Sequence, residues 1–443
     1  MKKLFVSAGL AAIGTASLQA SSTYAPDITA MDASKLWTIS GTLRGYYDDN
    51  YTTGHSDATG KRASWGFELS PQLSFIVPLQ QTELGLRYTY GLYYYQDREN
   101  RGANPIDQSH EADLWIDHDF SERWEGKVED TFVDSQEPQL TVTGSQFPYR
   151  TEGNNIDNTG VITVHTDWSL LFSTDLGYQN NYVQYQNHGT TIADFLAKGP
   201  SYGGLFDEIG HLIWLNLNYE DQPNLTFLAG YLFGINNYIG NEPIALGPLA
   251  GEVYFSDSRD SYSHYLYIGA KYSITENLSA TAEAGIQVSD NYNLPSFDTQ
   301  GSWSYQPYAQ IAATYTYLPG SYVQAGFTES EDTSDIATSS GATAASQGIA
   351  LFQETSVLYA SVNHQITPDL LASVIGHYQY STYQGGSVDG SGQAFYDVGL
   401  NLTYNINLYL SVEIGYNFDY VTAAGGLQSY SRNREYVGIT GTF

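Results

Sequence analysis

The sequence predicts a closed antiparallel transmembrane β-barrel, and three observations point to this fold class. Apolar and polar residues alternate with a period of two along most of the chain. Tight turns alternate with long polar loops, which is the asymmetry of outer-membrane barrels. The last stretch, residues 433–443, reads as a strand that stops on Phe443. Because a strand with open edges invites aggregation, we expect this strand to pair on both sides and close the barrel onto the first one.

Residues 1–20 have the layout of a secretory signal peptide, with two lysines, an apolar run and small residues up to Ala20. We therefore expect residues 21–36 to form a short periplasmic leader and residues 37–443 to form the barrel. No later segment contains the ~18 consecutive apolar residues that a transmembrane helix needs. The chain has no cysteine, which excludes a lipid-anchor cysteine, a disulfide framework and a thiolate metal site.

The composition fits strands that face lipid. The chain contains 39 Tyr and 7 Trp while charged residues make up only 15%, as expected for aromatic girdles at two membrane interfaces. The formal net charge is -31, and it becomes more negative when Lys2 and Lys3 leave with the signal peptide. This charge excludes nucleic acid as a partner. The expected partners are outer-membrane lipid and lipopolysaccharide, the barrel assembly machinery, and small hydrophilic solutes or cations.

The strands can be followed in order along the chain. Residues 37–48 alternate cleanly, and residues 63–77 and 82–95 repeat the pattern on either side of a tight turn at 78–81. Long polar loops are predicted at 48–62, 96–110, 134–158, 185–207, 239–260, 291–301, 330–352, 384–394 and 422–432. Further tight turns are predicted at 121–123, around Trp168, and at 220–224, 275–277, 318–320, 367–369 and 405–407.

These loops imply nine hairpins and hence 18 strands, with both chain ends on the periplasmic side. A 16-stranded barrel remains an alternative, because residues 124–133 place Asp130 on the lipid face and residues 160–168 alternate poorly. The alternation also assigns faces. Residues predicted to face lipid include Trp37, Leu43, Ile286, Val412 and Ile439. Residues predicted to face the lumen include Thr42, Glu283, Glu413 and Thr440.

Four segments carry a resemblance to a known family: the last strand, LPGSYVQAGF at 318–327, VNHQITPDL at 362–370 and TEGNNIDNTG at 151–160. The chain resembles the uncharacterised outer-membrane β-barrel proteins of the verrucomicrobial group, the putative β-barrel porins. The resemblance implies a porin-like barrel in the outer membrane of a Gram-negative-type bacterium, and it offers no catalytic residue. The usual insertion signal often has an aromatic residue where this chain has Gly441, so recognition by the assembly machinery rests chiefly on Phe443.

Two sets of charges are candidates for the pore wall. Glu111, Asp113, Asp117 and Asp119 share one face of one strand, and a tight turn at 121–123 would place Lys127 opposite Asp117. This ladder either concentrates cations in the passage or is an ordinary solvated wall, and the sequence leaves both interpretations open.

The second set lies on the strands that close the barrel. Its charges either produce a transverse field across the pore or neutralise one another across neighbouring strands, and the second interpretation is favoured. The full set of pore-lining candidates is Arg44, Glu68, Glu83, Arg87, Asp113, Asp117, Lys127, Lys271, Glu283, Glu413 and Arg434.

The long loop 134–158 is predicted to fold into the lumen and narrow it, with Phe147, Tyr149 and Arg150 docking on the wall. An external position of this loop is the alternative. No metal, cofactor or catalytic residue is expected. His110 with its acidic neighbours, and Asp48 to Asn50 with Asp57, do not match the spacing of known ligand sets.

The function expected from these observations is a passive diffusion channel for small hydrophilic solutes that prefers cations. A barrel of ~18 strands is too wide for side chains alone to fill, because ~8 strands already enclose a packed interior. The alternative is a non-conducting structural or surface-binding barrel protein. A homo-oligomer, with a trimer as the expected form, fits either function.

Overall fold

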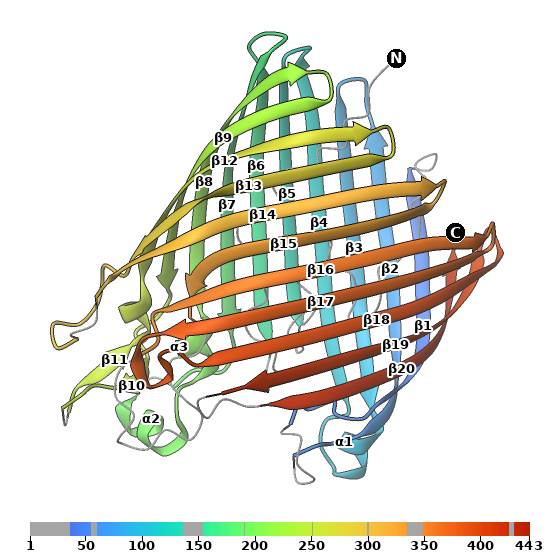
Figure 1. The fold of residues 1–443 in the computed structure, drawn as a ribbon. Coiled ribbons are helices and arrows are strands. Elements are labelled where there is room, and N and C mark those ends of the chain that lie inside the picture. The colour runs from blue at the N-terminus through green and yellow to red at the C-terminus, as the bar shows by residue number, and fades with distance from the viewer. Residues whose placement is uncertain are drawn as a thin grey trace.

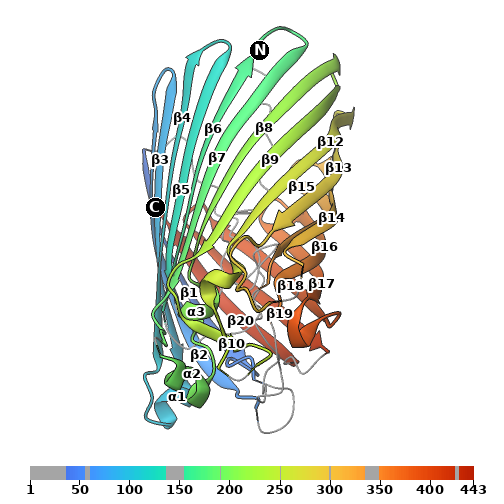
Figure 2. The same ribbon diagram turned by 90° about the vertical axis from the view of Figure 1, so that its left-hand side faces the viewer.

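The structure is a computed structural model that describes residues 36–54, 60–135, 154–189, 191–249, 251–298, 301–334, 349–424 and 429–443. The predicted signal peptide, and the predicted leader apart from its last residue, lie outside these residues. Figures 1 and 2 show inclined strands wrapped into one barrel, with short turns at one end and larger loops with small helices at the other.

The described strands of the barrel form a single antiparallel sheet of 18 strands, which confirms the predicted number and excludes 16. Their bounds are β1 Trp37–Asp48, β2 Ser64–Pro78, β3 Thr82–Tyr95, β4 Ile106–Ser121, β5 Trp124–Ser135, β6 Asn155–Asp167, β7 Phe172–Tyr185, β8 Glu208–Gln222, β9 Leu225–Tyr238, β12 Ser261–Thr275, β13 Leu278–Asp290, β14 Trp303–Leu318, β15 Ser321–Thr333, β16 Phe352–Thr367, β17 Leu370–Gln384, β18 Gly392–Asn407, β19 Leu410–Ala423 and β20 Tyr430–Thr442.

The loops carry the remaining elements. A separate two-stranded sheet lies in the loop between β9 and β12. The bounds are β10 Pro243–Leu246, β11 Val253–Phe255, α1 Gln96–Asn100, α2 Ile192–Lys198, α3 Tyr202–Phe206, and the 3-10 turns η1 Ser256–Arg259 and η2 Gly386–Val388. No helix in the described part of the chain is long and apolar enough to cross a membrane.

Closure takes place between the first and last strands, as predicted. β1 pairs with β20 from Ser40 opposite Thr442 to Asp48 opposite Arg434. Ile39 and Phe443 extend this ladder with two backbone hydrogen bonds of 3.1 and 2.8 Å. The terminal residue therefore contributes to the seal through its backbone.

The strands that alternate poorly in sequence, β5 and β6, are regular members of the wall. Asp130 does face outward, and Asn158 on the neighbouring strand donates hydrogen bonds of 3.2 and 3.3 Å to its carboxylate. A polar partner on the same face thus replaces the missing apolar residue. One predicted turn was wrong in position. β18 continues to Asn407, and the turn consists of Leu408 and Tyr409, two apolar residues that a search for polar turn residues misses.

The two faces separate as the alternation predicts. Trp37, Leu43, Ile286 and Ile439 expose between 41% and 53% of their surface on the outer face. Thr42, Glu283 and Thr440 expose at most 9% on the inner face, and Val412 and Glu413 are half-buried on opposite faces. Exposed apolar side chains all around the wall are what a bilayer solvates.

Paired histidines mark two levels on the outer face. Near the loop ends of β4, β8 and β12, three Tyr–His pairs are hydrogen-bonded through Nδ1 at 2.7 to 2.9 Å: Tyr88 with His110, Tyr178 with His211, and Tyr231 with His264. Near the turn ends, Thr82 bonds to His118 and Tyr317 bonds to His364. Amphipathic rings at two levels are typical of the two membrane interfaces, so the apolar band lies between them.

Candidate pore wall and loop assembly

All of the charged residues predicted to line the pore lie on the inner face of the sheet, where they alternate with the exposed apolar residues of the outer face. The constriction candidates Phe147, Tyr149 and Arg150 lie outside the described residues. The inner face can be divided into three regions: the closing seam, an acidic region on β3 to β5, and an apolar region on β8 to β14.

At the closing seam, formed by β19, β20, β1 and β2, Arg44 lies between two carboxylates. Its Nε donates to Glu413 Oε1 at 2.5 Å, and its Nη1 donates to Glu68 Oε1 at 3.2 Å. The guanidinium also lies 5.6 Å from the ring centroid of Tyr436. Arg44 and Glu68 expose only 3% and 1% of their surface. This geometry is that of the neutralising pairs that the sequence analysis favoured, and Glu413 completes a three-membered network.

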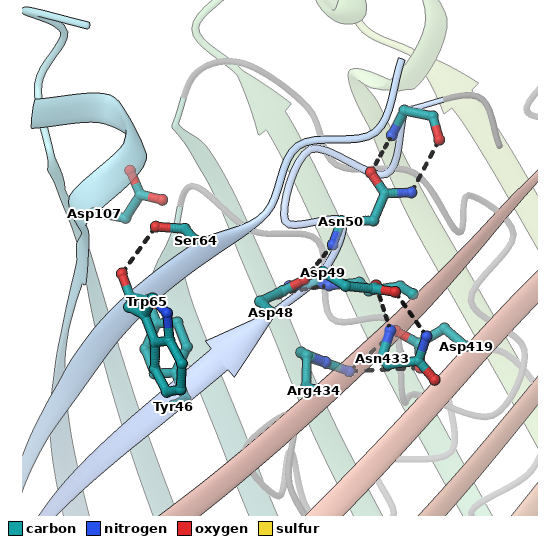
Figure 3. Close-up of polar contacts among 12 residues, drawn as sticks. Tyr46, Asp48, Asp49, Asn50, Ser64, Trp65, Asp107, Asp419, Asn433 and Arg434 are labelled. Atoms are coloured by element: carbon teal, nitrogen blue, oxygen red, sulfur yellow. Dashed lines mark hydrogen bonds and ion pairs between the residues drawn. The ribbon is translucent and has the colours of Figure 1, made fainter. Parts of the chain in front are cut away.

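Toward the loops, two further arginines of β20 are paired. Arg434 Nη2 lies 3.1 Å from Asp419 Oδ2, and Arg432 Nη2 lies 2.5 Å from Asp48 Oδ2. Figure 3 shows Arg434 beside Asp419, with Asp48 on the neighbouring strand. The sequence analysis named Arg434 but missed the other three residues. Alternation in the sequence places Asp48 and Asp419 on the inner face. It does not show that arginine side chains of β20 reach them across the neighbouring strands.

The acidic region carries more carboxylates than cations, and Lys127 is the cation near Asp117 and Glu125. Arg87 pairs with Asp113 at 2.8 Å, and the predicted register of Lys127 opposite Asp117 is confirmed. Lys127 Nζ, however, contacts Glu129 at 2.6 Å. Among the described residues, four carboxylates near the turn end have no ion pair with lysine or arginine. They are Glu83, Asp117, Asp119 and Glu125.

These four carboxylates are neighbours across strands. Glu83 on β3 lies directly opposite Asp117 on β4, and Asp119 lies directly opposite Glu125 on β5. Like charges at directly opposed positions destabilise a sheet. Such a pattern persists where water and mobile cations compensate the charge, as in an aqueous lumen.

The apolar region of the inner face was not predicted. Buried aromatic and leucine side chains pack into one cluster along the wall from β8 to β14: Trp214, Leu228, Leu232, Tyr265, Tyr267 and Tyr308. The rings lie over glycines, and a Cβ added at Gly177 would meet the Trp214 ring at 2.0 Å. The expectation of a uniformly polar inner face was therefore wrong here. Lys271 and Glu283 also belong to this wall, on β12 and β13.

The loops between β7 and β16 pack together at the extracellular end. Their core contains Ile244, Tyr254 and Ile349, with Leu351 and Phe352. Arg259 is fully buried and its guanidinium lies 3.9 Å from the ring centroid of Tyr238. Because a buried guanidinium needs acceptors, this residue organises the peptide groups around it. We call this unit the loop assembly.

Within the loop assembly, Asp207 and Asp260 each close a loop on the strand before it. Asp207 Oδ1 accepts from Tyr185 N at 2.7 Å, and Asp260 Oδ1 accepts from Tyr238 N at 2.8 Å. Burial raises the pKa of each carboxyl to about 6, although the backbone donor lowers it. The free energy of loop packing therefore depends on pH.

The metal-like set around His110 does not converge, and Asp57 of the second set lies outside the described residues. Across the described ranges, no group of three or more His, Cys, Asp or Glu residues could hold a metal ion. His110 faces outward and bonds to Tyr88, whereas Glu111 lies on the inner face beside Arg87. The period of two places neighbouring residues on opposite sides of the wall.

These features define a closed transmembrane barrel of the outer-membrane type. Residues 257–443, from η1 to the end of the chain, match the family described as Putative beta-barrel porin 2. The resemblance to β-barrel porins is thereby confirmed for this part of the chain, and the fold of the described residues is a closed barrel of 18 strands.

Solved structures of outer-membrane proteins are similar to this chain over most of its length. OccAB4 of Acinetobacter baumannii has 12% identity and a TM-score of 0.44, covering 92% of this chain and 99% of its own. OpdK of Pseudomonas aeruginosa has 10% identity and a TM-score of 0.44, with coverage of 92% and 99%. The siderophore receptor PiuA of Acinetobacter baumannii has 10% identity and a TM-score of 0.45, with coverage of 92% and 82%. No curated protein matches the sequence.

Proposed function

We propose that this protein is a water-filled channel of the outer membrane that passes small hydrophilic solutes and prefers cations. The observation that carries the preference is the imbalance between the paired and unpaired charges of the inner face. The arginines Arg44, Arg87, Arg432 and Arg434 are each held by carboxylates, so their charge is neutralised locally. Glu83, Asp117, Asp119 and Glu125 of the acidic region have no ion pair with lysine or arginine in the described part of the chain.

Electrostatics then favours cations. Unpaired carboxylates at Glu83, Asp117, Asp119 and Glu125 lower the potential at one end of the passage. Loops farther than roughly 8 to 10 Å from the passage are screened at physiological salt, so the total charge of the chain matters less than this group. The selectivity of a pore is set where charges lie close to the permeating ion.

Reversal potentials of the purified protein in a potassium chloride gradient test the proposal. The wild type should give a potential of the cation-selective sign, and the double variant Glu83→Gln, Asp117→Asn should move it toward zero. Asp130→Asn is the matched control, because it removes a carboxylate from the outer face of β5 and should leave the potential unchanged. An anion-selective sign in the wild type would refute the cation preference.

A non-conducting surface-binding barrel is the second candidate, and the loop assembly favours it. Buried apolar contacts among loops from β7 to β16 give this end of the barrel a defined shape that a partner could recognise. Absence of conductance in correctly folded protein would support this candidate over the channel.

A further inference from the structure

One place in the barrel wall departs from regular pairing, between β14 and β15. The two strands pair from Leu318 opposite Ser321 only as far as Ala309 opposite Glu329. Beyond this point β14 continues for six residues, 303–308, paired with β13 alone. β15 continues to Thr333, paired with β16 alone. Figure 1 shows β15 curving away from β14 near its end, toward α3.

The end of β15 lies on the inner side of the wall. The backbone oxygen of Glu331 accepts a hydrogen bond of 2.5 Å from Gln287 Nε2, and its backbone nitrogen donates to Gln287 Oε1 at 2.9 Å. The side chain of Glu331 accepts from Ser304. Gln287 and Ser304 are inner-face residues of β13 and β14. The wall is therefore doubled here, and the end of β15 projects into the lumen.

Thr333 and Ser334 attach this end to β9, a strand four places away in the sheet, and to the loop that follows β9. Thr333 Oγ1 accepts hydrogen bonds of 3.1 Å from both Asn236 Nδ2 and Tyr238 Oη, on β9. Arg259 Nη1 donates to the Ser334 carbonyl at 2.7 Å. Neighbouring strands lie about 4.8 Å apart, so the end of β15 leans across a substantial width of the mouth.

Arg259 joins this end to the loops. Its Nη2 donates to the carbonyls of Gly204 and Leu205 at 3.1 and 2.7 Å, in addition to the bond of Nη1 to Ser334. The start of β16 follows the same course, because Ile349 and Phe352 belong to the apolar core of the loop assembly. We call residues 330–334 and 349–352 the inner shelf.

On the side that faces β15, no described residue pairs with the outer part of β14. Pro307 occupies this stretch, and proline in a sheet is confined to edges because it cannot donate a ladder hydrogen bond. Two positions are open to residues 330–333. One is the inner side of β13, where they lie in this structure, and the other is the edge of β14 in continuation of their register, where Pro307 would leave one ladder hydrogen bond unmade. A segment that can occupy two discrete positions is a bistable element, and gating depends on such elements.

We propose that the inner shelf forms the size-limiting constriction at the extracellular mouth, that Arg259 holds it there, and that its release onto the β14 edge widens the passage. This inference rests on the proposed channel function. It places the constriction on β15 and β16, apart from the 134–158 loop that the sequence pointed to. Passage size is then set by a piece of the wall itself.

Conductance of Arg259→Gln tests the proposal. The shorter amide cannot bridge Ser334 to Gly204 and Leu205, so the shelf should loosen, with a severalfold rise in single-channel conductance and entry of larger solutes. Arg98→Gln is the matched control. Arg98, like Arg259, lies over a tyrosine ring, 4.4 Å from the centroid of Tyr95. It pairs with the carboxylate of Asp107 and belongs to α1, and among the described residues no hydrogen bond or ion pair joins it to the shelf.

A pair of introduced cysteines reports the position of the shelf independently, because the chain has none of its own. Asn236→Cys with Thr333→Cys should react with a short bifunctional thiol linker in high yield, and in low yield when Arg259→Gln is added. Linking the pair before the conductance measurement should restore wild-type conductance in the Arg259→Gln background. Folding of every variant is verified by heat-modifiable migration.

The outcomes separate the two proposals. Linker yield that falls without any rise in conductance would overturn the shelf as the constriction, and linker yield unaffected by Arg259→Gln would overturn the role of Arg259. If the wild type does not conduct and the Arg259→Gln variant does, the inner shelf is supported as the constriction. The proposal that the wild-type channel is constitutively open is then overturned. If both proteins are silent although the linker shows release, both proposals fail.

Discussion

The closing seam and the β14–β15 junction both join neighbouring strands of the wall, but they differ in how completely the strands pair. At the seam, β1 pairs with β2 along its whole length and with β20 over nearly all of it. Buried arginine–carboxylate pairs bridge the inner face there. At the junction, pairing stops midway and β15 passes behind β14. β1 and β20, which lie far apart in the chain, therefore pair almost completely, whereas the consecutive strands β14 and β15 do not. Sequence distance does not decide how completely two strands pair in this barrel.

The physical reason lies in the alternatives open to each strand end. Every residue of β1 finds a backbone partner only within the wall, so complete pairing is the way to avoid unsatisfied groups. The end of β15 has other donors and acceptors within reach, supplied by Gln287, Asn236 and Arg259. A segment with two ways to satisfy its backbone is free to leave the wall at low cost. We expect the seam to govern stability and the junction to govern passage.

The largest effect should follow from breaking the seam network. Arg44→Ala leaves Glu68 and Glu413 without their cation, and removing one partner of a buried ion pair destabilises a protein by about 3 to 5 kcal/mol. Urea unfolding in micelles, followed by heat-modifiable migration, measures this. Arg87→Ala is the comparison on an open part of the wall, where the pair with Asp113 is partly exposed and should be worth roughly 1 kcal/mol or less. Equal losses for both would contradict a special role of the seam.

Deleting Phe443 should have the next largest effect. The residue contributes two backbone hydrogen bonds to Ile39, each worth about 0.5 to 1.5 kcal/mol, and its ring stacks on Tyr409. Gly441→Ala is the control, because an added Cβ would lie 3.6 Å from the Phe443 ring, an ordinary contact. The yield of folded barrel should drop for the deletion alone. A normal yield without Phe443 would show that the seam closes without its last residue.

Hydrogen exchange of backbone amides compares the junction with the seam directly. In residues 303–308 of β14, where Pro307 has no amide hydrogen, alternate amides should point to the unpaired edge. These amides should exchange at least tenfold faster than inner amides of β1, corresponding to about 1.4 kcal/mol less protection. Mass spectrometry with peptide resolution measures the difference. Protection of residues 303–308 equal to that of residues 309–314 would mean that β15 occupies the edge in solution.

The smallest effect concerns pH and the loop assembly. The pKa of Asp207 and of Asp260 is raised from 3.8 to about 6 by burial, so packed loops bind protons more tightly than unpacked ones. The stabilisation is complete below the ordinary value of 3.8 and is lost as pH rises through 6. Around Asp260 lie Asp257, which raises its pKa, and Arg259, which lowers it; around Asp207 lie Glu242, which raises its pKa, and His188, which lowers it.

The channel should therefore open and close less often at pH 5 than at pH 7.5, because protonation favours the packed loops that hold the inner shelf. Asp207→Asn with Asp260→Asn should reduce this dependence, and Asp194→Asn, which changes an exposed carboxylate on α2, should retain it. Single-channel recordings at the two pH values measure the frequency. More frequent transitions at pH 5 in the wild type would contradict the sign derived from these pKa values.

The alternation of apolar and polar residues, with the spacing of turns and loops, was sufficient to predict the barrel. The period of two predicted the faces of β1, β13 and β20, and the spacing of turns and loops predicted 18 strands, because both signals are local consequences of burying one face of each strand in lipid. The same alternation placed Arg44, Glu68 and Glu413 on the inner face. Register follows from tight turns, so Lys127 opposite Asp117 was also predictable.

Tertiary structure alone decided what the inner face does with these residues. Which carboxylate Arg44 holds depends on side chains of β2 and β19, which lie 24 and 369 residues away in the chain. The apolar cluster around Trp214 forms because rings from three strands pack with leucines of β9, and the rings of Trp214 and Tyr267 cover glycines on neighbouring strands. The inner shelf was not predicted, because residues 330–333 are all polar and were assigned to the loop 330–352. Their departure from the wall results from a balance between two sets of backbone partners, and that balance exists only once β9, β13 and the loop assembly are in place.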